Sequence, residues 1–178
     1  MSSDSKTENL GTLLIAEDEI DFRELLASLL RPHCSQLLLA GNGREALNLF
    51  RSGQIDAVLT DVKMPLMTGL QFLAELRGSF IQTPVIVLTG QGDFATIQEA
   101  LRLDASDFVE KPCENDHLVE SVKKALAYGL ALRKMDEELD LLYAQSGLPA
   151  DQIVRLKRLK RVALGMRIGF SSYVKKTA

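Results

Sequence analysis

Side chains that can hold a cation or a phosphate group stand at the ends of four short apolar segments of this chain. They are Glu17, Asp18, Glu19, Asp61, Thr89 and Lys111. Carboxylates, together with water and phosphate oxygens, are the ligands that Mg²⁺ prefers, and lysine supplies a compact positive charge for phosphate oxygens. Brought to one place, these residues would form a magnesium site with an anionic group beside it.

Each acidic position also has a simpler interpretation. Asp61 precedes a loop punctuated by Pro65 and Gly69, and an isolated acid there often only caps a turn. The run 17–19 could be a solvated acidic loop. Three adjacent carboxylates repel one another, however, so a bound cation is an economical reason to place them together. The fold must decide between these interpretations.

Five short apolar segments alternate with stretches of helical spacing. The segments span 12–16, 36–40, 57–60, 84–88 and 106–109. The apolar residues at helical spacing between them are Phe22, Leu25, Leu26, Leu29, Leu30, Ala46, Leu47, Phe50, Leu70, Phe72, Leu73, Leu76, Ile97, Ala100 and Leu101. Because parallel strands need crossover connections and the crossovers here are helical, the alternation predicts a parallel sheet covered on both faces by helices. The carboxyl ends of such strands share one edge, where we expect the polar side chains to converge.

Four motifs, in this order, resemble the receiver domain of two-component response regulators, of the chemotaxis-regulator type. The motifs are LIAEDE (14–19), DVKMPLMTG (61–69), VLTG (87–90) and DFVEKP (107–112). The resemblance covers roughly residues 10–130 and leaves the C-terminal residues unassigned. It implies an α/β fold with a doubly wound, flavodoxin-like sheet of five parallel strands in the order 2-1-3-4-5, followed by a C-terminal helical extension.

The resemblance also implies roles for the acidic residues. Asp61 resembles the phosphoacceptor, a carboxylate nucleophile that takes a phosphoryl group from a phosphohistidine of a partner histidine kinase. Asp18 and Asp61 would bind Mg²⁺ directly, Glu17 would act through water, and the backbone carbonyl of Lys63 would complete the protein ligands. The family usually has Asp where this chain has Glu17, so the metal geometry is expected to differ slightly.

The remaining roles concern the phosphoryl group and a conformational switch. By resemblance, Lys111 would pair with the phosphoryl oxygens, and the bond from Lys111 to Pro112 is expected to be cis. Thr89 would donate its hydroxyl to the phosphoryl group, which lets Phe108 turn inward. The implied protein is a signalling module rather than an enzyme, apart from its own phosphotransfer and autodephosphorylation. A hydrolase that uses Asp61 is disfavoured, because no second acid follows two places on.

The composition is that of an ordinary globular protein, with 178 residues, 46% hydrophobic content and a net charge of −3. This length predicts one domain with some chain to spare. Cys34 and Cys113 match no metal spacing and are expected to be reduced thiols. No apolar run approaches the roughly 20 residues of a membrane span, and residues 1–9 lack the apolar core of a secretory signal. We therefore predict no membrane span and a cytoplasmic location.

The pattern after the fifth apolar segment predicts a helix that continues beyond the receiver domain. Its apolar positions, at alternating spacings of three and four with a polar break at Ser121, are Leu118, Ala125, Tyr128, Leu132, Met135, Leu139 and Leu142. Such spacing is typical of a helix that pairs, either with its copy in a homodimer or with the chain's own tail. We predict a disordered segment over 1–10, a receiver domain over 11–130 and a helical extension over 131–178, coiled-coil-like to about 145 and basic thereafter.

The tail from Asp151 onward carries eight basic residues and one acid, a net charge of +7, so the remainder carries −10. The favoured interpretation is a helix that packs back on the preceding one. A docking or nucleic-acid surface is the second, and a helix on a membrane surface is the third. Two functions follow: a phosphorylation-controlled module that acts through dimerisation or partner binding, or a DNA-binding transcriptional regulator that uses the basic tail.

Overall fold

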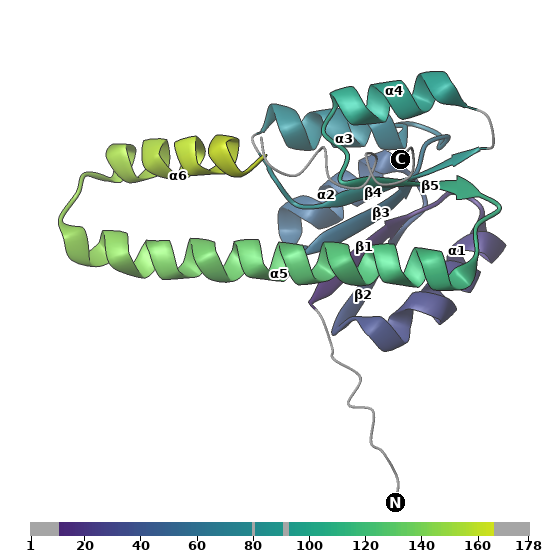
Figure 1. The fold of residues 1–178 in the computed structure, drawn as a ribbon, viewed down its shortest axis with the longest axis horizontal. Coiled ribbons are helices and arrows are strands. Elements are labelled where there is room, and N and C mark those ends of the chain that lie inside the picture. The colour runs from purple at the N-terminus through teal and green to yellow at the C-terminus, as the bar shows by residue number, and fades with distance from the viewer. Residues whose placement is uncertain (1–10, 80, 91–92, 166–178) are drawn as a thin grey trace, which may run out of the picture.

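The computed structural model describes residues 11–79, 81–90 and 93–165. The prediction of disorder for 1–10 lies outside these residues. The chain alternates strands and helices (Figure 1). The strands are β1 (Thr12–Ala16), β2 (Gln36–Ala40), β3 (Ala57–Asp61), β4 (Val85–Gly90) and β5 (Asp107–Lys111). The α-helices are α1 (Ile20–Leu30), α2 (Gly43–Ser52), α3 (Gly69–Gly78), α4 (Phe94–Arg102), α5 (Asn115–Ser146) and α6 (Ala150–Gly165), and a 3₁₀ turn, η1 (Arg31–His33), follows α1.

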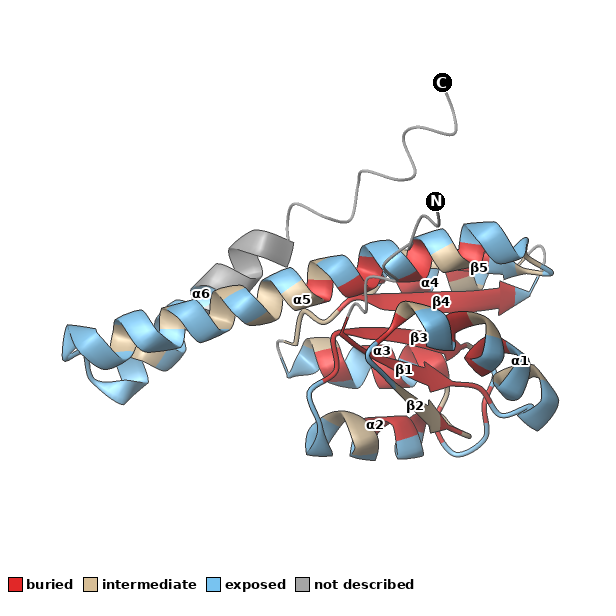
Figure 2. Cartoon of the chain, turned by 90° about the horizontal axis from the view of Figure 1, so that it is seen from below, coloured by how far each residue is buried: buried red, intermediate tan, exposed pale blue. Residues whose placement is uncertain are grey.

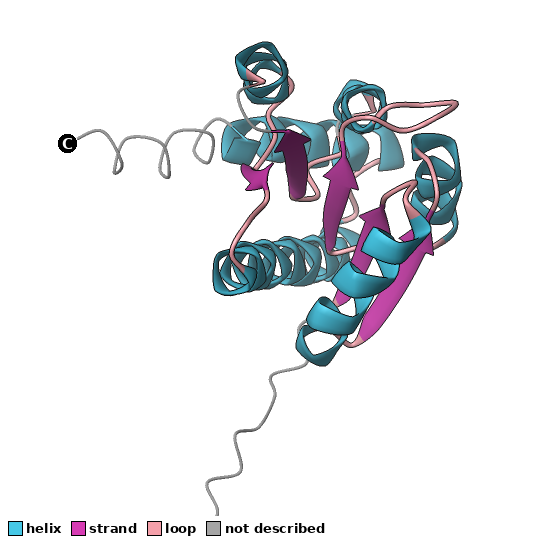
Figure 3. Ribbon diagram, turned by 90° about the vertical axis from the view of Figure 1, so that its right-hand side faces the viewer, coloured by secondary structure: helices cyan, strands magenta, loops and turns pink. Residues whose placement is uncertain are grey.

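The five strands form one parallel sheet in the order β2-β1-β3-β4-β5. Helices α1 and α5 cover one face, and α2, α3 and α4 cover the other (Figure 3). Both faces of the central strands are therefore buried, which explains their continuous apolar sequences. The predicted fold class and strand order are confirmed.

Three strands extend further than the sequence pattern predicted, and β3 does so by the single residue Asp61. β4 continues through Gly90, so Thr89 lies within the strand, and β5 ends at Lys111 itself. The apolar pattern stops earlier because these last residues are polar, although their backbones still pair in the sheet, with Gly90 opposite Lys111. Consequently the backbones of Thr89 and Lys111 are fixed by the sheet rather than by loops.

Helix α5 has two parts with different surroundings. Its first half packs on the sheet, and its buried residues there are Leu118, Ser121, Val122, Ala125, Leu126 and Gly129. Ser121, the polar break in the pattern, is satisfied because its hydroxyl donates to Asp107 Oδ2 at 2.6 Å. The second half projects beyond the sheet and ends at Ser146, after which Gly147 takes a left-handed conformation. Leu141 and Leu142 there are 66% and 61% exposed. Most of this half of α5 is coloured as exposed or intermediate in Figure 2.

Helix α6 runs back along α5 toward the receiver domain (Figure 1). Its apolar residue Ile153 is half-buried, whereas Val154, Leu156 and Leu159 remain exposed. The direction of α6 is the one that the favoured interpretation of the tail requires. Much of the apolar surface of the helical pair is nevertheless left uncovered by the described residues.

An ion pair fixes the start of the α5 extension to the sheet. Arg133 Nη1 donates to Asp56 Oδ2 at 3.0 Å, and the same oxygen accepts the backbone N–H of Thr12 at 2.7 Å. Asp56 is 2% exposed and directly precedes β3. Gly129, one turn before Arg133, lies so close that a Cβ would collide with the carbonyl of Asp56. The helix can reach Asp56 because this position has no side chain.

No helix among the described residues is long and apolar enough to cross a bilayer. Cys34 and Cys113 are free cysteines, and their reduced state stays a prediction.

Candidate functional site

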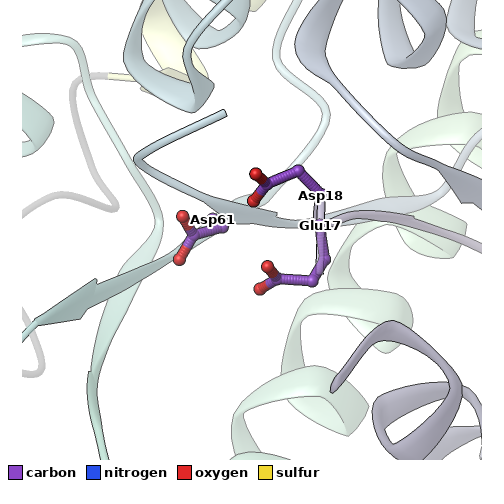
Figure 4. Close-up of side chains that lie close together, drawn as sticks. All are labelled: Glu17, Asp18 and Asp61. Atoms are coloured by element: carbon purple, nitrogen blue, oxygen red, sulfur yellow. The ribbon is translucent and has the colours of Figure 1, made fainter. Parts of the chain in front are cut away.

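Three carboxylates converge at the carboxyl edge of the sheet. Glu17 and Asp18 follow β1, and Asp61 ends β3. One oxygen from each lies within 4.8 Å of the others, and the three side chains lie close together (Figure 4). Strands β1 and β3 pair directly and in parallel, so their ends must lie side by side. The register of two buried strands therefore creates this acidic cluster.

Glu17 is an unusually buried acid, only 2% exposed. Its carboxylate accepts hydrogen bonds from Lys111 Nζ at 2.8 Å and from the backbone N–H of Glu19 at 3.3 Å. Burial raises the pKa of Glu17; the bond from Lys111 opposes this effect, and the negative charge of Asp61 adds to it. A further positive charge nearby would stabilise the ionised form of a carboxylate in these surroundings.

Lys111 joins two of the three acids. Its Nζ lies 2.6 Å from Asp61 Oδ1 as well as 2.8 Å from Glu17 Oε2. The ammonium also stands 4.5 Å from the centroid of the Phe22 ring, a cation–π contact. Burial lowers the pKa of Lys111, but the bonds and charges of Asp61 and Glu17 outweigh it and raise the pKa overall. The lysine is therefore held in its charged form, and its bond to Pro112 is cis.

The loop after β3 orients Asp61. Its Oδ2 accepts the backbone N–H of Lys63 at 2.7 Å. Gly69, the first residue of α3, lies against the backbone of Asp61 so closely that any Cβ would collide with its carbonyl. Thr68 and Gln71 cap the start of α3 reciprocally, which fixes the far end of the loop. Asp61 is only 9% exposed. Its Oδ2 is held by the backbone N–H of Lys63 and its Oδ1 by the ammonium of Lys111.

The two predicted switch residues lie on the neighbouring strands. Thr89 is 1% exposed, and its hydroxyl has no hydrogen-bond partner among the described residues. A buried hydroxyl without a partner is uncommon and calls for an explanation. Phe108 is half-buried and packs against the core cluster under α2, α3 and α4. The structure places both residues, and their switching role stays a prediction.

Two residues of α1 belong to this site although the sequence pattern did not single them out. Phe22 was assigned only to the core, yet its ring lies beside the Lys111 ammonium. Arg23 donates from Nη1 to the carbonyl of Glu17 at 2.6 Å and so fixes the turn that carries the acids. Both lie one helical turn after the acidic run, which is the sequence signal that could have found them.

The donor set fits a hard divalent cation. All three converging groups are carboxylates, and oxygen ligands are what Mg²⁺ selects. Lys111 neutralises part of the charge of Glu17 and Asp61, whereas Asp18 is exposed and makes no ion pair with any residue that the structure describes. The cluster thus retains negative charge that a cation can offset. The position of the Lys63 carbonyl as a ligand stays a prediction.

The chain is similar to known bacterial regulators. Regulatory protein AtoC of Escherichia coli K12 is 37% identical over 134 residues, which are 75% of this chain and 28% of AtoC. Transcriptional regulatory protein ZraR of the same organism is 35% identical over 116 residues, 65% of this chain and 26% of ZraR. The chain therefore spans only about a quarter of the length of these curated relatives.

Solved structures show the same similarity. The receiver domain of NtrX from Brucella abortus has a TM-score of 0.60 at 29% identity, over 64% of this chain and 97% of that one. The Francisella response regulator 1452 receiver domain has a TM-score of 0.61 at 27% identity, over 65% of this chain and 95% of that one. Residues 13–123 match the family model of the response regulator receiver domain, and the chain therefore belongs to this family of two-component signalling proteins.

Proposed function

We propose that Asp61 accepts a phosphoryl group from the phosphohistidine of a partner histidine kinase in a Mg²⁺-dependent reaction. The observation that carries the proposal is that the Asp61 carboxylate lies beside the acids Glu17 and Asp18 and also beside the ammonium of Lys111. A nucleophilic carboxylate needs neighbours that offset the charge of the incoming phosphoryl group: Lys111 can do so directly, and the acids can do so through the cation that they would hold.

The transfer of the phosphoryl group from phosphohistidine to Asp61 needs no further reactant. An oxygen of Asp61 forms a bond to phosphorus while the bond from phosphorus to the imidazole nitrogen breaks, which gives an acyl phosphate and a free histidine. Glu17, Asp18 and Asp61 would hold the Mg²⁺, which when bound offsets the negative charge between carboxylates and phosphate. The backbone N–H of Lys63 orients one Asp61 oxygen, and Lys111 is within reach to pair with phosphoryl oxygens.

The phosphoryl group would then change the conformation through Thr89. Its hydroxyl is buried and has no partner among the described residues, so a phosphoryl oxygen offers a bond that the unmodified protein lacks. Movement of Thr89 toward Asp61 would open space into which Phe108 turns. We propose that this change controls dimerisation or partner binding through the helical extension, residues 131–178, with residues 11–130 as the receiver domain.

We propose that the protein is a signalling module and that its only catalysis is its own phosphotransfer and autodephosphorylation. We propose that it works in the cytoplasm, where a histidine kinase presents its phosphohistidine. The exposed apolar residues of α5 and α6, such as Leu142 and Leu159, support pairing of the extension as a coiled coil with a second copy.

A second candidate function is DNA-binding transcriptional regulation. The similarity to the transcriptional regulatory protein ZraR and the +7 charge of residues 151–178 favour it. Deletion of 151–178 with loss of a salt-dependent affinity for duplex DNA would select this function. A homodimer that strengthens with beryllofluoride, a mimic of the phosphoryl group, would select the first.

Intact mass spectrometry after incubation with acetyl phosphate and Mg²⁺ tests the phosphoacceptor proposal. The native chain should gain the mass of one phosphoryl group, and the gain should disappear when Mg²⁺ is chelated. Asp61→Asn should gain nothing. An equal gain in Asp61→Asn would refute the assignment.

A further inference from the structure

The peptide group between Glu17 and Asp18 sets how two of the three converging acids are spread. The side chains of these consecutive residues leave the backbone in different directions, and Asp61 lies near both (Figure 4). Mg²⁺ accepts little deviation from ideal ligand geometry. The interactions that hold this peptide group therefore affect how well the cluster fits the cation.

Asp18 is the member of the cluster whose position depends on the backbone alone. The ammonium of Lys111 bonds both Glu17 and Asp61. The carboxylate of Asp18 is exposed and forms no hydrogen bond or ion pair with any residue in the described part of the chain. Its place beside Asp61 is consequently determined by the turn that joins β1 to α1.

Arg23, in the first turns of α1, holds that turn through the backbone of Glu17. Its Nη1 donates to the carbonyl of Glu17 at 2.6 Å, and this carbonyl belongs to the peptide group that leads to Asp18. The N–H of Glu17 donates to the carbonyl of Ala40 at 3.0 Å. The backbone of Glu17 is thus fixed by the neighbouring strand on one side and by Arg23 on the other.

The guanidinium of Arg23 is itself restrained. Arg23 is half-buried, and a Cβ on Gly41 would lie only 3.4 Å from its Nη1. The N–H of Gly41 donates to Glu45 Oε2 at 2.7 Å, which ties this turn to α2. Arg23 forms no ion pair with a residue that the structure describes. Its bond to a carbonyl is what positioning requires, whereas neutralisation of the acids would require a bond to a carboxylate.

We propose that Arg23 is a positioning residue for the Mg²⁺ site. Its bond to the Glu17 carbonyl holds the Asp18 carboxylate where the cation needs it, although Arg23 does not touch the cation. The inference rests on the Mg²⁺ site of the proposed function and assigns part of its affinity to a residue outside it. Residues that orient a metal ligand commonly contribute about 10–100-fold to metal affinity.

The sign of the effect separates positioning from simple electrostatics. Arg23 is a positive charge near the acidic cluster, so its removal would strengthen Mg²⁺ binding if only charge mattered. Removal weakens binding if Arg23 orients Asp18, in spite of the more negative surroundings.

Isothermal titration calorimetry with Mg²⁺ on the full chain tests the proposal. Arg23→Met should weaken binding by about tenfold or more, and so should Arg23→Gln, which is also neutral and has a shorter side chain. Arg23→Lys keeps the charge and can donate one bond, so it should bind Mg²⁺ more tightly than Arg23→Met. Unchanged or tighter binding in both neutral variants would overturn the proposal.

A double substitution tests whether Arg23 acts through Asp18. In the Asp18→Asn background, Arg23→Met should cause little further loss, because the ligand that it orients has already been altered. An equal fold-loss in both backgrounds would contradict this route.

Arg44 is the matched control for the loss of one positive charge. It is exposed on the first turn of α2, at the same edge of the sheet, and forms no bond to the turn that carries the acids. Arg44→Met should change the affinity for Mg²⁺ by less than about twofold, because exposed charges are screened. Far-UV circular dichroism checks that all variants are folded. Equal weakening in Arg44→Met and Arg23→Met would refute the positioning role.

Phosphorylation by acetyl phosphate, followed by intact mass spectrometry, keeps this inference distinct from the phosphoacceptor role. Arg23→Met should need more Mg²⁺ for half-maximal phosphorylation but should reach the native yield at saturating Mg²⁺, because Asp61 and Lys111 are unchanged. A yield that stays low at saturating Mg²⁺ would contradict the positioning role. A native chain that binds Mg²⁺ but gains no phosphoryl group would refute the phosphoacceptor role alone, and the Mg²⁺ affinities would still decide the role of Arg23.

Discussion

Lys111 Nζ lies 2.6 Å from Oδ1 of Asp61, the proposed phosphoacceptor, and 2.8 Å from Oε2 of Glu17. The lysine thereby bridges acids from two different strands, and its pKa is raised by these bonds in spite of burial. In the unmodified protein the ammonium offsets the mutual repulsion of Glu17 and Asp61. When a phosphoryl group is attached to Asp61, the same ammonium is already in place to pair with it.

Asp18 and Glu19 form a matched pair for testing the metal site. Both are exposed, but only Asp18 contributes an oxygen to the converging cluster. We expect Asp18→Asn to weaken Mg²⁺ binding by at least about tenfold, because the site loses one charged ligand. Isothermal titration calorimetry with Mg²⁺ measures the change. Glu19→Gln should bind Mg²⁺ like the native chain, and an equal loss in both variants would show that only the summed charge matters.

Thr89 should matter for the phosphoryl group and not for stability. Because its buried hydroxyl has no partner in the described part of the chain, Thr89→Val should change the free energy of unfolding by less than about 1 kcal/mol. The same substitution should weaken beryllofluoride binding about tenfold or more, since a bond to a charged group is lost. Thermal unfolding with increasing beryllofluoride measures both quantities.

Thr89→Ser is the control, because it keeps the hydroxyl. It should retain most of the stabilisation by beryllofluoride. If Thr89→Val responds like the native chain, the switching role of Thr89 is wrong.

Arg133 should be required for stability although it lies far from the acidic cluster. Arg133→Met leaves the buried Asp56 carboxylate with the N–H of Thr12 but without its ion-pair partner. We expect the free energy of unfolding to fall by about 2–4 kcal/mol, measured by urea denaturation. Lys134→Met, at the neighbouring exposed position, should change it by less than about 0.5 kcal/mol. Similar small effects in both variants would mean that the extension is not anchored to the sheet.

Tyr128 should make the protein less stable at alkaline pH. Burial raises the pKa of its phenol, and the negative charge of Asp104 raises it further. Above about pH 10 the unfolded chain therefore loses this proton before the folded chain does, so stability falls as pH rises. In Tyr128→Phe the free energy of unfolding should fall less steeply above pH 10, as measured by urea denaturation at successive pH values. Near pH 7 the substitution should be close to neutral, because the hydroxyl has no partner among the described residues.

The sequence predicted the sheet and the converging acids because both depend on local patterns. Short apolar segments separated by helical spacing define the order of elements, and parallel strands bring the residues that follow them to one edge. Glu17, Asp18 and Asp61 meet for this reason alone. The cis bond at Pro112 was also expected, from the resemblance to the receiver family.

Contacts that depend on the angle and depth of a helix were not visible in the sequence. Asp56 and Arg133 are 77 residues apart and meet because α5 crosses the sheet where Gly129 permits close approach. The contact of Phe22 with Lys111 likewise depends on the rotation of α1. Leu25, counted in the apolar spacing of α1, is 62% exposed, because that helix buries a narrower strip than its sequence offers.

The most direct test of the central claim locates the acyl phosphate along the chain. After incubation with acetyl phosphate and Mg²⁺, reduction with borohydride converts a phosphorylated aspartate into homoserine, which peptide mass spectrometry identifies by position. The account predicts homoserine at position 61 and unchanged residues at 17 and 18. Homoserine at position 18, or none at position 61 in a chain that has gained a phosphoryl group, would contradict it.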